Sequence, residues 1–98
     1  MFTRSDVKRA EHEMAAMIKK TFGEIWNPPI GELMYHGCSI ELKSMIPLDN
    51  ALWEICQRAK HKGALRAFGK IEVRDVGETM RLVIFYKQER KDEQFDRG

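Results

Sequence analysis

The sequence predicts a two-layer α+β domain, with two helices on a small antiparallel sheet in the order α-β-α-β-β. Apolar residues recur at three- and four-residue steps in two segments, which is typical of helices with one buried face. They alternate with polar residues in the segments that follow, as in half-buried strands. With 98 residues the chain has the length of one small domain, which we assign to 1–88, followed by a charged tail at 89–98.

The first helix is expected at residues 4–25. Thr3 with Asp6 has the spacing of a capping box, and Phe2 with Val7 that of a hydrophobic staple. The buried stripe should consist of Val7, Ala10, Met14, Met17, Ile18 and Phe22. The Asn-Pro-Pro sequence at 27–29 ends the helix, because proline excludes the helical conformation from the residue before it.

A strand and a second helix come next. The strand is indicated by the alternating apolar residues Cys38, Ile40 and Leu42. Gly37 is expected to mark a bulge at its start. Pro47 suits the first position of the second helix, and Gly63 can supply the left-handed residue that ends it. Its buried face should consist of Leu48, Leu52, Ile55, Cys56 and Ala59.

The last two alternating segments predict a hairpin. With its tip at residues 76–77, Glu72 lies opposite Arg81 and Phe68 lies opposite Phe85. The other face of the hairpin then pairs apolar residues with apolar residues. A slip of one residue would destroy the match on both faces, so this register is strongly indicated.

The composition excludes several classes of protein. Seventeen Lys and Arg against fifteen Asp and Glu disfavour both a strongly basic nucleic-acid-binding protein and an acidic DNA mimic. No apolar run approaches the roughly 18 residues that cross a membrane. The first residues do not have the pattern of a secretory signal, so we expect a cytoplasmic protein with reduced Cys38 and Cys56. No spacing indicates a metal site, and no cofactor is expected.

The outer face of the hairpin is the most informative surface, because Phe68, Val83 and Phe85 share it with Lys and Arg residues. Either the first helix or a second subunit covers these apolar side chains, or they bind a partner. Trp53 lies off the apolar stripe of its helix and Trp26 lies in a proline-containing loop. Tryptophan is enriched at protein interfaces. The predicted protein-binding residues are therefore Trp26, Trp53, Phe68, Val83 and Phe85.

Binding of single-stranded nucleic acid is the alternative. Aromatic rings that stack on bases, interleaved with cations that neutralise phosphates, are typical of such surfaces. The predicted residues for this function are Arg58, Lys60, Lys62, Arg66, Lys70, Arg81 and Lys87. Three of these cations can instead be explained by the end of the second helix, whose dipole favours positive charge.

Catalysis has little support in the sequence. His36 and Cys38 share one face of a strand and could form an activated thiolate, but no third orienting group is identifiable. A small toxin-like ribonuclease is a second alternative, by analogy of fold alone. Its set would be Arg58, Lys60, His61, Arg66, Lys70 and Arg81.

The leading hypothesis is a non-enzymatic module that attaches to a larger protein and modulates its activity. A homodimer is expected, since so small a domain gains stability from association. Small chains of this kind are often accessory or inhibitor proteins. A phage-encoded protein acting on nucleic-acid machinery is an example drawn from base rates and not from the residues.

Overall fold

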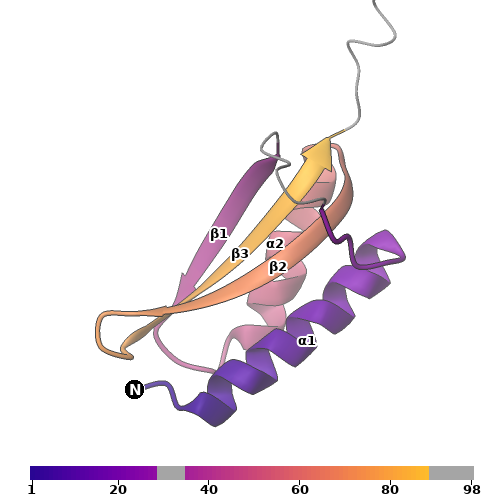
Figure 1. The fold of residues 1–98 in the computed structure, drawn as a ribbon. Helices are drawn as coiled ribbons and strands as arrows, with labels where there is room; N and C mark the ends of the chain where they lie inside the picture. The colour runs from indigo at the N-terminus through magenta and orange to yellow at the C-terminus, as the bar shows by residue number, and fades with distance from the viewer. Residues whose placement is uncertain (29–34, 89–98) are drawn as a thin grey trace, which may run out of the picture.

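The computed structural model describes residues 1–28 and 35–88, and the predicted tail at 89–98 lies outside them. The expected α+β class and the order α-β-α-β-β are confirmed (Figure 1). The elements are α1 (Arg4–Phe22), β1 (His36–Leu42), α2 (Leu48–His61), β2 (Ala64–Arg74) and β3 (Thr79–Gln88).

The three strands form one antiparallel sheet in the order β1-β3-β2, so β3 is central and β2 is an edge strand. The predicted hairpin register is confirmed, with Glu72 opposite Arg81 and Phe68 opposite Phe85. The predicted bulge at Gly37 is wrong, because Gly37 pairs with Phe85 without any shift in register. The register shift lies instead in β2, between Ala64 and Arg66.

Helix α1 begins at the predicted capping box. The Asp6 N–H donates to the Thr3 hydroxyl at 3.1 Å, and the Thr3 N–H donates to the Asp6 carboxylate at 2.9 Å. The helix ends three residues earlier than predicted, at Phe22. Gly23 adopts the left-handed conformation, with φ of 88°, and its N–H donates to the Lys19 carbonyl at 2.8 Å. This glycine cap therefore ends the helix before the prolines do.

Helix α2 follows the prediction closely. Pro47 is the residue just before its first turn rather than within it. The predicted left-handed residue at Gly63 is confirmed, with φ of 88°. The side chain of Gln88, at the end of β3, donates to the Lys62 carbonyl at 2.8 Å and ties this turn to the sheet.

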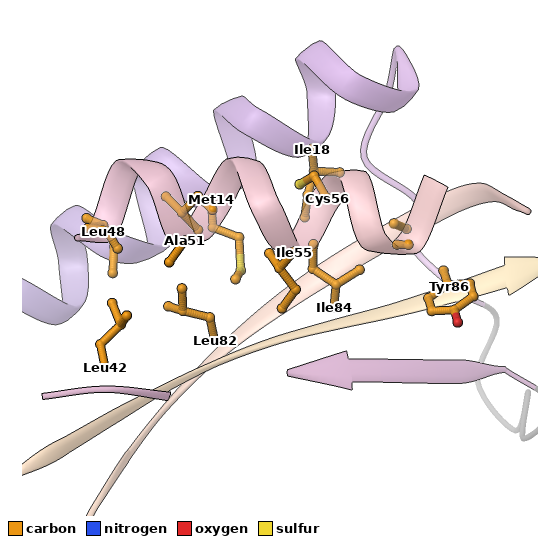
Figure 2. Close-up of a cluster of buried hydrophobic side chains, with 14 of the residues drawn as sticks. Met14, Ile18, Leu42, Leu48, Ala51, Ile55, Cys56, Leu82, Ile84 and Tyr86 are labelled. Carbon is orange, nitrogen blue, oxygen red and sulfur yellow. The ribbon is translucent and has the colours of Figure 1, made fainter. Parts of the chain in front are cut away.

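Both helices pack on the same face of the sheet and share one hydrophobic core (Figure 2). Met14 and Ile18 of α1 lie close to β2, where a Cβ on Gly69 would collide with Met14 and meet Ile18 at 3.0 Å. Glycine at this position lets the helix approach the strand. The largest fully buried apolar side chains are Ile18, Leu48, Leu52, Ile55, Met80, Leu82 and Ile84.

The chain after α1 reaches the edge of β2. The Trp26 N–H donates to the Ala67 carbonyl at 3.1 Å, and the Trp26 ring lies 5.8 Å from that of Phe68. Because Phe68 belongs to the sheet face opposite the helices, this segment passes around the edge of the sheet. In the described residues no helix is long and apolar enough to cross a membrane.

Candidate functional site

Four aromatic side chains, here called the aromatic cluster, gather on the outer face of the sheet: Trp26, Tyr35, Phe68 and Phe85. Phe68 and Phe85 stack across β2 and β3, with ring centroids 5.1 Å apart and an interplanar angle of 28°. Tyr35 meets both edge-on, at 5.8 and 5.5 Å. Trp26 lies 5.8 Å from Phe68 and 6.2 Å from Tyr35. Such edge-on and offset geometries are the favourable ones for aromatic pairs.

The aromatic cluster changes the interpretation of the predicted protein-binding residues. Trp26 is 8% exposed and Val83 is 6% exposed, so neither offers much surface to a partner. Phe68 and Phe85 are half-buried. The prediction that the first helix covers the outer face of the sheet is wrong, because α1 packs on the opposite face. Trp26 and Tyr35, which lie outside the helices and strands, contact Phe68 instead, and the sequence pattern did not predict a role for Tyr35.

The predicted basic residues fall into two groups on different elements. Four lie on outward-facing positions of β2 and β3, and the others lie in or just after the last turn of α2. The outer group is Arg66, Lys70, Arg81 and Lys87, and the helix group is Arg58, Lys60 and Lys62. The basic residues expected to form one patch thus come from two surfaces, which meet at Ser39, where both Arg58 and Arg81 donate a hydrogen bond.

Arg58 and Arg81 already have partners. Arg81 lies 3.6 Å from the Glu72 carboxylate and donates to the Ser39 hydroxyl at 3.4 Å. Arg58 pairs with Glu54 at 2.9 Å and donates to the Ser39 carbonyl at 3.4 Å. These contacts stabilise the local fold, and they reduce the charge available to a phosphate.

His36 and Cys38 do not form an activated pair. Burial raises the pKa of the Cys38 thiol, whose Sγ lies 3.9 Å from the Ile55 carbonyl oxygen. The His36 ring stacks on Tyr86, with centroids 5.6 Å apart. A raised pKa leaves less thiolate, which is the nucleophilic form. Among the residues that the structure describes, no group of three His, Cys, Asp or Glu side chains could hold a metal ion.

The exposed side of the helices has a groove of about 240 Å³ between α1 and α2. Its lining residues are Glu13, Ala16, Met17, Lys20, Asp49 and Leu52. Trp53 follows Asp49, one of these lining residues, by one helical turn on α2. Its side chain is 57% exposed, which agrees with its predicted place off the buried stripe. We call Trp53 and the groove residues together the Trp53 surface.

The acidic end of the Trp53 surface holds two carboxyl groups side by side. A hydrogen bond from Arg9, at 2.6 Å, lowers the pKa of Glu13. The hydrogen bond between Glu13 and Asp49 raises the pKa of Asp49. The groove thus combines an apolar floor with a polar border of both signs. Comparisons with protein families, with curated proteins and with solved structures find no match to this chain.

Proposed function

We propose that this chain is a non-enzymatic binding module that docks on a larger protein through the Trp53 surface and modulates that protein's activity. The observation that carries the proposal is the exposed indole of Trp53, one helical turn from Asp49 in the lining of an apolar groove. Large aromatic side chains at interfaces contribute much binding free energy, because they bury a rigid surface with little loss of entropy.

The groove has the composition of an interface centre and its rim. Met17 and Leu52 supply apolar floor, while Lys20, Glu13 and Asp49 supply charge at the border. Interfaces of moderate affinity commonly pair an apolar centre with such a polar rim. A cytoplasmic location and a homodimer belong to the same proposal, and the two unpaired cysteines suit a reducing compartment.

Trp53→Ala tests the proposal. Tagged full-length protein would be expressed in cells and isolated together with its partner. The purified partner would then be titrated against each variant. We expect Trp53→Ala to weaken binding at least tenfold, as for an interface hot spot. The free energy of unfolding should stay the same, because the indole is exposed. Lys60→Ala, on the same helix, is the matched control, and equal binding by both variants would remove the Trp53 surface as the docking site.

Binding of single-stranded nucleic acid is a second candidate, supported by the exposed Arg66 and Lys70 beside Phe68. Against it, Phe68 already stacks on Phe85 and meets Tyr35. Anisotropy of a labelled oligonucleotide should reveal binding that falls steeply between low and physiological salt. Absence of binding at low salt would exclude this function and leave the protein-binding proposal intact.

A further inference from the structure

The edge of β2 that faces away from β3 carries no further strand in the described part of the chain, and it is a second surface able to bind a polypeptide. Along a strand, the N–H and C=O groups of alternate residues point to the same side. The Ala67 carbonyl accepts from Trp26 at this edge, so Gly69, Ile71 and Val73 present their backbone groups there as well. Within the described part of the chain, no other main-chain hydrogen bond reaches this edge. Such an edge can pair with an added strand.

A groove of about 320 Å³ runs along the same edge. It is bordered by α1 on one side and by β2 on the other. The residues that line it from α1 and the segment after it are Glu11, Met14, Ala15, Ile18, Ile25 and Asn27. A strand paired with Gly69 and Ile71 would place alternate side chains over this mainly apolar lining, and Ile25 is 42% exposed at present.

The charges on the outward side of β2 indicate which residues the added strand would carry. Glu72 is paired with Arg81 at 3.6 Å, and Arg74 with Glu41 at 3.9 Å. Lys70 is exposed and has no ion-pair partner among the residues that the structure describes. Opposite charges on directly paired residues are favourable in sheets. An acidic residue opposite Lys70 would therefore complement this edge.

We propose that the β2 edge binds one extended segment of a partner protein, in which acidic and apolar residues alternate. The apolar residues would face the groove and the acidic ones would lie beside Lys70, as a fourth strand of the sheet. A single segment fits better than a second copy of this chain. Because Glu11 and Ala15 of α1 line the groove, edge-to-edge pairing would bring the α1 helix of a second copy into the same space.

This inference rests on the proposed function only in that the partner is a protein, since the β2 edge is separate from the Trp53 surface. The probe is a nine-residue peptide of alternating Glu and Val with blocked ends, added to the full-length chain. We expect it to slow amide hydrogen exchange at Gly69, Ile71 and Val73. A matched peptide of alternating Lys and Val should leave these amides unchanged.

Lys70→Glu tests the charge argument. It should weaken binding of the acidic peptide about fivefold and allow the lysine peptide to bind, because one favourable cross-strand pair becomes a repulsive one. Lys60→Glu, which makes the same charge change on α2, is the control and should have no effect. Ile71→Pro removes one edge N–H and should abolish binding of the acidic peptide.

Three results would overturn the inference: no binding at millimolar peptide, protection located away from β2, or protection of β2 in a dimer that forms without peptide. Light scattering would identify the last of these. Trp53→Ala should leave peptide binding unchanged. If the peptide does not bind while Trp53→Ala still weakens binding of the natural partner, the inference about the β2 edge is wrong and the proposed function stands.

Discussion

Phe85 stacks on Phe68 with ring centroids 5.1 Å apart, and a Cβ on Gly37 would lie 3.2 Å from the Phe85 ring. Phe85 is thus enclosed by neighbours on both adjoining strands, and Tyr35 meets it edge-on at 5.5 Å. These contacts make the outer face of the sheet a small second apolar cluster. Phe85 therefore contributes to the stability of the fold, and its ring is not an open surface on which a base could stack.

Phe85→Ala should lower the free energy of unfolding by about 3 kcal/mol, since truncation of a packed aromatic residue leaves a cavity. It should also shift the fluorescence of Trp26 to longer wavelength as the aromatic cluster loosens. Urea unfolding and emission spectra, both in a Trp53→Phe background, would measure the two effects. A stability change below 0.5 kcal/mol, typical of surface substitutions, would contradict the packing role.

The helices, strands and hairpin register were predictable because they depend on local periodicity and on pairing between neighbouring segments. Thr3 and Asp6 correctly predict the start of α1, and Glu72 with Arg81 is one of the pairs that predict the register of the hairpin. The predicted end of α1 is three residues too late, because it rests on the Asn-Pro-Pro sequence, whereas the left-handed Gly23 ends the helix first.

The covering of the outer face was not predictable in the same way. Trp26 and Tyr35 lie outside the helices and strands, in sequence without a period, and their contacts with Phe68 join parts of the chain more than thirty residues apart. The grouping of the basic residues was not predictable for the same reason. Continuity in the sequence suggested one patch, but the turn at Gly63 sends Arg58 and Lys70 to opposite sides of the sheet.

Val76→Gly should stabilise the protein by about 1 kcal/mol. Val76 has a φ of 54° at the hairpin tip, where the Gly77 N–H donates to the Arg74 carbonyl at 3.1 Å. A β-branched residue is strained in this left-handed conformation, whereas glycine adopts it readily. At 90% exposure, Val76 also has little packing to lose.

Urea unfolding would measure the gain at the tip. Val73→Gly, within β2, is the matched control and should lower stability by about 0.5–1 kcal/mol, because glycine weakens a strand interior. If Val76→Gly destabilised the protein as Val73→Gly does, the turn would not be strained at this residue.

The stability of the protein should fall at alkaline pH because of Cys56. Burial raises the pKa of this fully buried thiol from 9.0 to about 11. In the unfolded chain the thiol ionises near pH 9, whereas in the folded protein it stays protonated until about pH 11. Its contribution to stability is therefore complete below pH 9 and is lost as the pH rises towards 11, by about 2–3 kcal/mol.

Cys56→Ala isolates this effect from the titration of lysine and tyrosine, which both proteins share. The variant should be less stable at neutral pH, because it leaves a small cavity. Its stability should nevertheless decline less steeply between pH 8 and pH 10.5 than that of the natural sequence. Urea unfolding at several pH values gives both curves. Parallel curves would mean that the thiol ionises as readily in the folded protein as in the unfolded chain, against its burial in the hydrophobic core.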